Sequence, residues 1–383
     1  MVSVASTQAP TRRSRKDLTR RLPLVVALAA VLFAVIYVLF LAKVAPAIPG
    51  TEDWRSTTSG SAVFDNPGAF LATLLDGLTL SGWLFIVASG FTLIFGLMRV
   101  VNMAHGAFYL LGGYIAYEIQ QAMANTGGQT LLSNQATIWN WLVPALVAAA
   151  CIGVVGLATQ QALLRWNQGQ DLRQALITIA VSVIVADQII AHFPRSVPPG
   201  AIQFGGNNVS MTWPGWTFQQ VNLHLWGVHY NLARMFMFGL GVTVGVLLWL
   251  WLYRTKTGMV IRAGVDDRHM TSALGINIQI TFAVAFFVGS ALAGFGAAVG
   301  AAQAGVSQGE DGKWLLYSLV VVIVGGMGSL IGAAAGALLY GLVFTFAAAY
   351  LPVDQAQYSI VLTFLLLVLV LAFRPQGLFG RPE

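Results

Sequence analysis

The side chains that could bind a solute are grouped at two glycine-bearing interruptions of long apolar runs. The first interruption, residues 96–106, contains Asn102 and His105, which are three residues apart and would share one face of a helix. Their neutral amide and imidazole groups suit a polar or zwitterionic small molecule. A helix cap by Asn102 and ordinary packing by His105 fit the sequence equally well, and both interpretations can hold together.

The second interruption reads Gly-Gly-Met-Gly-Ser at residues 325–329. Non-helical backbone at membrane depth persists only where protein or a water-filled cavity satisfies its amide groups. Interrupted apolar segments in corresponding halves of a chain are a sequence indication of a transport site. Gly328, Gly332 and Gly336 recur every four residues, however, which is also typical of close helix packing. We predict a solute pathway along Asn102, His105, Gly106, Gly326, Gly328 and Ser329.

The sequence contains no recognisable set of catalytic or nucleotide-binding residues. Of the four lysines only Lys313 follows a glycine, and Trp314 comes next, so the phosphate-binding Gly-Lys-Ser/Thr motif is missing. The five histidines form no HExxH motif and no pair at a spacing of four residues. The single cysteine, Cys151, lies in an apolar stretch and is expected to be buried and inert. We therefore expect no enzyme activity, no cofactor and no metal in this chain.

The composition excludes a water-soluble globule. Hydrophobic residues make up 57% of the 383 residues and charged residues only 9%, whereas a soluble domain has about 25% charged residues. The net charge of +6 could indicate a nucleic-acid partner, but residues 1–21 hold six basic residues and one acidic residue. The remainder of the chain is almost neutral, so we expect a lipid bilayer and no nucleic acid as partner.

Ten apolar segments follow the basic tail. A hydrocarbon core about 30 Å thick requires a helix of about 20 apolar residues. Residues 314–324 are too short to span unaided, and if they are re-entrant the number of spans falls by one or two. We predict an all-α polytopic transmembrane helical bundle with about 8–10 spans, some broken or re-entrant. The segments are residues 22–42, 77–97, 101–120, 139–163, 175–193, 231–253, 278–301, 314–324, 329–350 and 355–373.

The distribution of positive charge predicts the orientation. With the N-terminus in the cytoplasm, 15 of the 20 lysines and arginines fall on the inner side, as cytoplasmic loops require. Both termini are then cytoplasmic in a multi-pass protein of the cell membrane. We predict two parts, a basic cytoplasmic tail at residues 1–21 and a single transmembrane domain at residues 22–383.

The cytoplasmic loop 254–277 mixes charged and apolar residues. We expect residues 266–274 to form an amphipathic helix of two to three turns, begun by its acidic residues and stopped by Gly275. Such a helix suits docking of a soluble partner, and a solvated turn on the membrane surface is the alternative. Its apolar face would contain Met270, Ala273 and Leu274.

Several stretches resemble the permease subunits of ABC importers for branched-chain amino acids. They are Asn-Met-Ala-His-Gly at 102–106 with the following residues 108–114, residues 267–277 ending in Ala-Leu-Gly-Ile-Asn, Gly-Gly-Met-Gly-Ser at 325–329, and Arg-Pro-Gln-Gly-Leu-Phe-Gly at 374–380. They occur in the order found in that family and cover about residues 70–383. The resemblance is closer to the subunit type that carries Asn-x-Ala-His-Gly than to its companion permease.

The resemblance implies inward transport of branched-chain or related small amino acids, driven by ATP hydrolysis on a separate subunit. It implies as partners a second permease, two cytoplasmic ATPases and an extracellular solute-binding protein. Ala107 and Ile331 depart from the family pattern, which leaves a urea or short-amide permease as the alternative. A self-contained channel or facilitator is the alternative from another class. The residues implied in coupling to the ATPase are Arg262, Asp266, Asp267, Arg268, Leu274 and Gly275.

Overall fold

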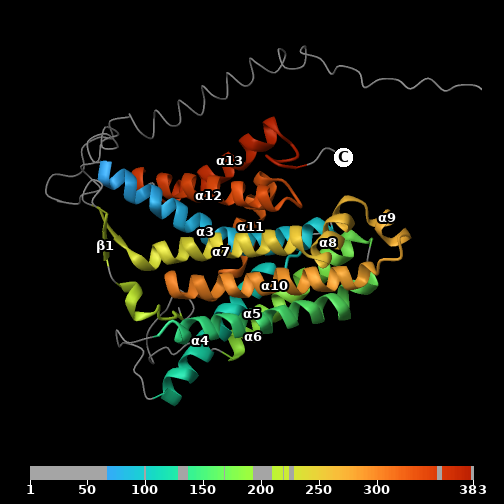
Figure 1. Ribbon diagram of the computed structural model, residues 1–383, viewed down its shortest axis with the longest axis horizontal. Helices are drawn as coiled ribbons and strands as arrows, with labels where there is room; N and C mark the ends of the chain where they lie inside the picture. Colours follow the sequence, from blue (N-terminus) through green and yellow to red (C-terminus); the bar gives the residue numbers. More distant parts are fainter. Residues whose placement is uncertain are drawn as a thin grey trace, which may run out of the picture.

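The computed structural model describes residues 67–98, 101–127, 137–167, 169–192, 209–218, 220–223, 228–351 and 356–380. The predicted basic tail and the predicted first span, residues 22–42, lie outside these ranges. The described residues form a bundle of long helices with a single two-stranded hairpin, β1 (Gln220–Leu223) and β2 (Val228–Asn231), at one end (Figure 1). The prediction of an all-α polytopic helical bundle is confirmed.

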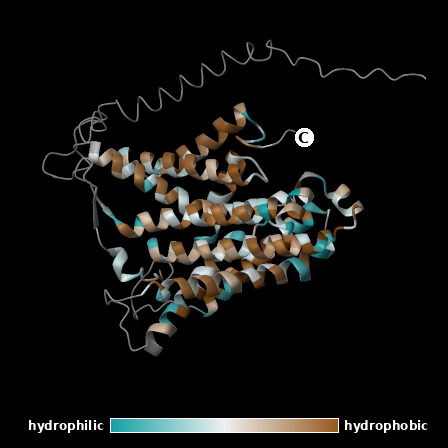
Figure 2. Ribbon diagram, in the orientation of Figure 1, coloured by the Kyte–Doolittle hydropathy of each residue, from teal (hydrophilic) through white to brown (hydrophobic). Residues whose placement is uncertain are grey.

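Seven helical segments in the described part of the chain are long and apolar enough to cross a membrane. Hydrophobic residues predominate along their lengths in Figure 2. α4 is long but more polar, and α11 is too short. The helices are α3 (Pro67–Met98), α4 (His105–Gly127), α5 (Trp139–Thr159), α6 (Asp171–His192), α7 (Leu232–Arg254), α8 (Lys256–Asp266), α9 (Arg268–Ala273), α10 (Ile278–Gln303), α11 (Asp311–Gly325), α12 (Leu330–Tyr350) and α13 (Ser359–Phe373).

The core of the bundle is the contact of α3 and α10, which are the most buried of the seven spans. Glycines allow their backbones to touch, since a β-carbon on Gly90 would overlap the carbonyl oxygen of Gly289. α4 approaches in the same way, because a β-carbon on Gly112 would lie 2.6 Å from the α-carbon of Gly294. Small residues at helix contacts are the usual means of close packing in lipid.

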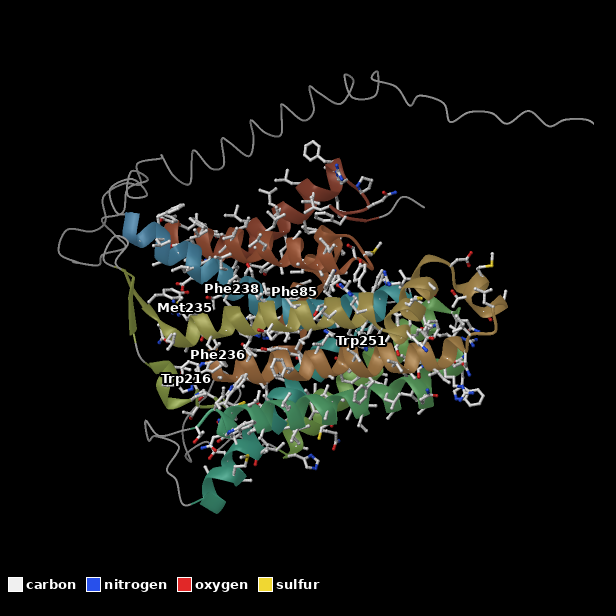
Figure 3. All side chains as sticks on the ribbon, in the orientation of Figure 1. Phe85, Trp216, Met235, Phe236, Phe238 and Trp251 are labelled. Carbon is white, nitrogen blue, oxygen red and sulfur yellow. The ribbon has the colours of Figure 1, made fainter. Side chains whose placement is uncertain are left out.

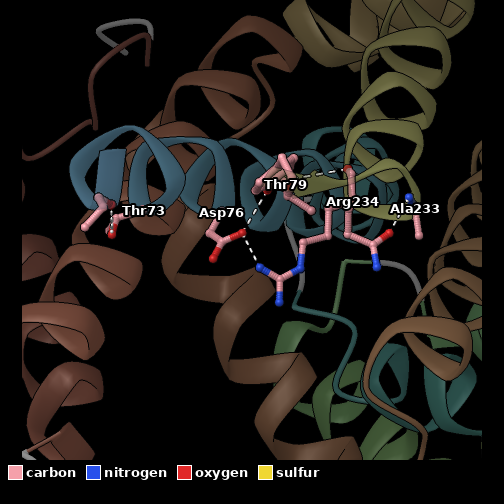
Figure 4. A network of polar contacts seen from close by, with 8 residues as sticks. Thr73, Asp76, Thr79, Ala233 and Arg234 are labelled. Carbon is pink, nitrogen blue, oxygen red and sulfur yellow. Dashed lines mark hydrogen bonds and ion pairs between the residues drawn. The ribbon is translucent and has the colours of Figure 1, made fainter. Parts of the chain in front are cut away.

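The hairpin marks one end of the bundle, called here the hairpin end (left in Figure 1), and α8 and α9 mark the other, called the α8 end. At the hairpin end Asp76 of α3 forms an ion pair with Arg234 of α7 and accepts a hydrogen bond of 2.8 Å from the Tyr230 hydroxyl (Figure 4). Thr79 joins this network through the Tyr230 hydroxyl at 3.1 Å. The network fastens the hairpin and the start of α7 to α3.

Aromatic and glycine contacts continue this α3–α7 interface along the bundle (Figure 3). A β-carbon on Gly82 would lie 3.2 Å from the α-carbon of Phe238, and one on Gly245 would lie 2.9 Å from the ring of Phe85. Trp216, from the turn before the hairpin, packs edge-on against Phe236 with ring centroids 5.2 Å apart. α7 is thus held along most of its length by one neighbour.

The short helix α11 begins inside the thickness of the bundle. α11 and α12 meet at the α8 end, where a β-carbon on Gly325 would overlap the carbonyl of Gly332. With 15 and 21 residues, the two helices are about 22 and about 32 Å long at a rise of about 1.5 Å per residue. Near the start of α11, Trp314 packs against Trp83 with ring centroids 4.2 Å apart, and Trp83 lies about 24 Å from the start of α3 at Pro67 at about 1.5 Å per residue. The predicted short segment, residues 314–324, corresponds to α11.

Three expectations from the sequence need correction. The helix predicted at residues 101–120 begins at His105, because residues 101–104 form a turn, and it continues to Gly127. The last helix begins at Ser359 rather than at residue 355, after one turn of 3-10 helix. Cys151 is exposed on α5, so the expected burial of its thiol was wrong.

Candidate functional site

Asn102 and His105 form the turn that starts α4, and both side chains are buried. The Asn102 Oδ1 accepts a hydrogen bond of 3.1 Å from the backbone N–H of Ala104. His105 Nε2 lies 3.1 Å from the carbonyl oxygen of Val87, which can only accept, so the proton is on Nε2. The ring also meets Phe91 edge-on at 5.3 Å. Capping by Asn102 and packing by His105 are therefore both present.

The unbonded side of Asn102 faces a small cavity. Among the described residues, neither Asn102 Nδ2 nor Gln174 Oε1 has a hydrogen-bond partner, and both residues line this cavity. Its volume of about 10 Å³ is close to the minimum for one water molecule. A branched-chain amino acid does not fit in this cavity. The other lining residues are Ile94, Met98, Val101, Leu164, Thr178 and Phe286.

α6 is attached to the Asn102 turn by polar contacts that the sequence analysis missed. Thr178 Oγ1 accepts a hydrogen bond of 3.2 Å from the N–H of Met103. Gln174 Nε2 donates over 2.8 Å to the carbonyl of Asn167. Gln160, which begins a π-helical turn after α5, is fully buried with neither amide atom bonded to a described residue. The polar residues Gln174 and Thr178 in the first turns of α6 could have indicated these contacts from the sequence.

Gly106 brings the start of α4 against the start of α11. A β-carbon on Gly106 would overlap the carbonyl oxygen of Asp311 and would lie 3.0 Å from the β-carbon of Leu315. Only glycine permits this approach. Two helices that begin inside the bundle therefore begin beside each other.

The Gly326–Ser329 turn lies at the α8 end, where it joins α11 to α12. Gly326 and Gly328 have φ of 106° and 79°, which glycine adopts without the strain that a side chain would cause. Ser329 caps α12, since its Oγ accepts a hydrogen bond of 3.0 Å from the N–H of Gly332.

The two predicted groups of pathway residues flank the last turn of α3. Ile94 and Met98 face the cavity beside Asn102. Gly96 faces the other way, because a β-carbon there would lie 2.9 Å from the α-carbon of Gly328. The structure thus places Asn102 and Gly328 against the same end of α3 but on different faces of it, whereas His105 lies deeper along α3, at Val87.

The chain beyond α13 returns to cover the end of α11. The N–H of Leu378 donates to the carbonyl of Val324 over 2.9 Å, and that of Phe379 donates to Gly325 over 2.9 Å. Gly377, with φ of 78°, has no room for a side chain, since its β-carbon would lie 2.6 Å from the α-carbon of Gly326. The Arg-Pro-Gln-Gly-Leu-Phe-Gly stretch therefore stabilises the glycine turn.

The segment expected to be one helix over residues 266–274 is interrupted at Asp267. Asp266 ends α8, and Asp267 has an extended backbone with φ of −148° and ψ of 104°. The Asp267 Oδ1 accepts a hydrogen bond of 2.9 Å from the N–H of Met270 and so caps α9. The predicted helix is therefore α9, which begins at Arg268 rather than at Asp266 and is capped by an acidic residue as expected. Gly275 follows α9 with φ of 79°, which agrees with the expected helix stop.

Large apolar side chains of α8 and α9 point away from the bundle. Met259, Met270 and Leu274 are 62%, 61% and 73% exposed, and we call them the α8–α9 surface. On the inner side Val265 lies about 3.7 Å from the β-position of Gly96 and 3.6 Å from that of Gly328. The Arg262 guanidinium packs 4.3 Å from the Tyr253 ring centre at the end of α7. In the described chain no three His, Cys, Asp or Glu residues gather as metal ligands do.

An apolar helical bundle with seven helices long enough to cross a membrane is the architecture of a polytopic membrane protein. The chain belongs to the family described as the permease component of branched-chain amino acid transport systems, whose sequence model matches residues 73–371.

Relatives from distant microorganisms match nearly their full lengths. The chain is 29% identical over 328 residues to the high-affinity branched-chain amino acid transport system permease protein BraD of Pseudomonas aeruginosa, covering 82% of this chain and 97% of that one. It is 28% identical over 331 residues to the corresponding protein LivH of Escherichia coli, covering 82% and 96%. A probable branched-chain amino acid transport permease protein LivH of Methanocaldococcus jannaschii is 22% identical over 319 residues, covering 80% and 92%. No solved structure matches the chain.

Proposed function

We propose that this chain is the permease subunit of an importer that moves branched-chain or related small amino acids inward, driven by ATP hydrolysed on a separate subunit. Family membership carries the proposal, because the family and the relatives are described as parts of branched-chain amino acid transport systems. The lack of a Gly-Lys-Ser/Thr motif in the sequence supports hydrolysis on a partner. The partners are a second permease, two ATPases and an extracellular solute-binding protein.

The α8 end is the cytoplasmic end in this proposal. Arg254 ends α7, and Lys256 and Arg262 lie in α8 at this end of the bundle. Arg374 follows α13, and the glycines that come after it, Gly377 and Gly380, pack against Gly326 at the same end of the bundle. Positive charge near the ends of spans favours the cytoplasmic side. The protein is then a multi-pass protein of the cell membrane, with both termini in the cytoplasm.

The α8–α9 surface is the proposed docking site for an ATPase. Its exposed methionines and Leu274 are of the type that a protein interface buries, and they lie beyond the apolar length of the spans. Val265 joins this surface to the end of α3 and to the glycine turn. A movement of α8 would therefore reach both groups of pathway residues. The proposed coupling residues are Arg262, Asp266, Asp267, Arg268, Leu274 and Gly275.

The proposed pathway residues remain Asn102, His105, Gly106, Gly326, Gly328 and Ser329. The cavity beside Asn102 is too small for an amino acid, so the proposal requires this region to widen during transport. The last turn of α3 lies between the two groups. A displacement of that turn would change the space on both of its faces at once, which makes it the element that opens the path.

Reconstitution of the complete importer in liposomes tests the proposal. With the solute-binding protein outside and ATP inside, we expect uptake of radiolabelled leucine that stops when ATP is omitted. Uptake of urea alone would favour the amide permease and contradict the amino-acid assignment. The chain by itself in liposomes should not admit leucine, and rapid passive uptake would identify it as a self-contained channel.

A further inference from the structure

The cavity beside Asn102 is bounded by three polar side chains that are almost completely buried. Asn102 lies in the turn that starts α4, while Gln174 and Thr178 lie on consecutive turns of α6. They are 3%, 2% and 1% exposed, and Thr178 is about 10 Å from the start of α6 at about 1.5 Å per residue. Because bulk solvent does not reach these groups, each position that is left without a hydrogen bond is costly.

Asn102 offers the cavity a donor. The backbone N–H of Ala104 can only donate, so the side-chain atom that it meets at 3.1 Å is the amide oxygen Oδ1. This contact fixes the orientation of the amide group. Nδ2 is therefore the atom on the other side, and it has no partner among the described residues.

Gln174 and Thr178 each offer an acceptor. Gln174 Nε2 donates over 2.8 Å to the carbonyl of Asn167, which leaves Oε1 without a partner among the described residues. The Thr178 hydroxyl donates its proton to the carbonyl of Ala175 over 2.9 Å and accepts from the N–H of Met103. A hydroxyl oxygen has two lone pairs, so one lone pair of Thr178 Oγ1 remains.

One donor and two acceptors define the kind of ligand that the cavity takes. A cation would be repelled by the N–H groups of Asn102, and an anion by the oxygens of Gln174 and Thr178. A neutral molecule that accepts once and donates twice satisfies all three groups. Water does this, the cavity of about 10 Å³ holds one water, and buried waters typically make about three hydrogen bonds. The other lining side chains are apolar and offer no competing bond; they are Ile94, Met98, Val101, Leu164 and Phe286.

We propose that this cavity binds one ordered water molecule that joins the start of α4 to α6. The water accepts a hydrogen bond from Asn102 Nδ2 and donates to Gln174 Oε1 and to Thr178 Oγ1. It adds to the direct bond between Met103 and Thr178, so α6 and the turn at Asn102 are held as one unit. The proposal rests on these contacts alone and does not depend on which solute the protein transports.

A density map of the complete importer, at a resolution that shows other buried waters, tests the proposal directly. We expect a single maximum within about 3.2 Å of Asn102 Nδ2, Gln174 Oε1 and Thr178 Oγ1. A cavity without density in such a map would overturn the proposal. So would a maximum that lies against the two oxygens and away from Nδ2, because that arrangement indicates a cation.

X-ray footprinting of Met98 provides a test in solution. A brief exposure splits bound water into hydroxyl radicals, which oxidise a methionine in contact with that water to the sulfoxide. Met98 lines the cavity, whereas Met237 of α7 is 2% exposed and does not line it. Mass spectrometry should find Met98 oxidised several-fold faster than Met237, equally in sodium chloride and in choline chloride. Equal rates for the two methionines would overturn the proposal, and a dependence on sodium would assign the cavity to a cation.

Two substitutions of Gln174 separate the water from other causes of Met98 oxidation. Gln174→Leu removes one of the two acceptors and should lower Met98 oxidation several-fold while Met237 stays unchanged. Gln174→Glu is the matched control, since a buried carboxyl takes up a proton. It then donates to the carbonyl of Asn167 and still accepts from the water, so Met98 oxidation should persist. Undiminished oxidation in Gln174→Leu would refute water binding by Gln174. An equal loss in both variants would assign the effect to packing and would also overturn the proposal.

Discussion

Gly96 at the end of α3 packs directly against Gly328 in the turn between α11 and α12, with 2.9 Å between the β-position of the first and the α-carbon of the second. Val265 of α8 lies within 3.7 Å of the β-position of each. Three elements that are far apart in the chain therefore meet at one point. The exposed helix pair and the interior of the bundle are connected through this junction.

Gly96→Leu should separate α3 from the glycine turn. The side chain has no space against the Gly328 backbone, and overpacking of this kind costs about 1–3 kcal/mol. We expect a lower midpoint of thermal unfolding in detergent and a loss of ATP-driven uptake. Gly239→Leu, at a position with open space, is the control and should keep both properties. An unchanged unfolding midpoint for Gly96→Leu would show that the junction is not tightly packed.

Asp267→Ala should unravel α9. The variant removes the carboxylate that caps the N–H of Met270, and loss of a helix cap costs about 1 kcal/mol. α9 has only six residues, so it has little other stabilisation. Amide hydrogen exchange in residues 268–274 should accelerate. Asp267→Asn keeps the cap and should exchange like the original protein; equal acceleration in both variants would instead assign the effect to the charge.

Leu274→Asp should uncouple ATP hydrolysis from transport. Leu274 is 73% exposed, so the charge is tolerated in the isolated chain. In a contact with an ATPase it would be buried, and a disrupted central contact costs about 2 kcal/mol or more, equivalent to at least about a tenfold loss of uptake. Leu274→Met preserves the apolar contact and is the control. Normal ATP-dependent uptake by Leu274→Asp would count against docking at the α8–α9 surface.

Thr178→Val should loosen α6 from the Asn102 turn. Valine has the shape of threonine but cannot accept the hydrogen bond from the N–H of Met103. A buried donor left without its partner costs about 1–3 kcal/mol. The midpoint of thermal unfolding should fall for Thr178→Val. It should stay unchanged for Thr178→Ser, which keeps the hydroxyl. Equal midpoints of thermal unfolding for the two variants would show that the hydrogen bond from the N–H of Met103 contributes little to stability.

The sequence predicted the spans well because the bilayer requires long apolar runs. The contacts of Gly332 with Gly325 and of Gly336 with Val321 confirm the close packing expected from the recurrence of glycine at 328, 332 and 336. It could not predict which apolar residues are buried. Cys151 lies on a face of α5 that the bundle leaves exposed, and in a membrane protein lipid-facing and buried positions are equally apolar. Hydrophobicity alone therefore does not separate them.

The sequence also did not reveal where α9 begins or at which end of the bundle the second glycine interruption lies. The helix expected over residues 266–274 begins two residues later, because the Asp267 side chain accepts a hydrogen bond from the N–H of Met270 and caps α9. The second glycine interruption was visible, but its place at the α8 end depends on the contact of Gly328 with Gly96. Thr178 and Gln174 were overlooked because their partners, Met103 and Asn167, come from other segments.

The shortness of α11 also has a consequence for biogenesis. A helix of about 22 Å cannot cross a hydrocarbon core of about 30 Å on its own, so the insertion machinery cannot release it into lipid as a separate unit. α11 must enter together with α12, as a hairpin whose tip is the Gly326–Ser329 turn.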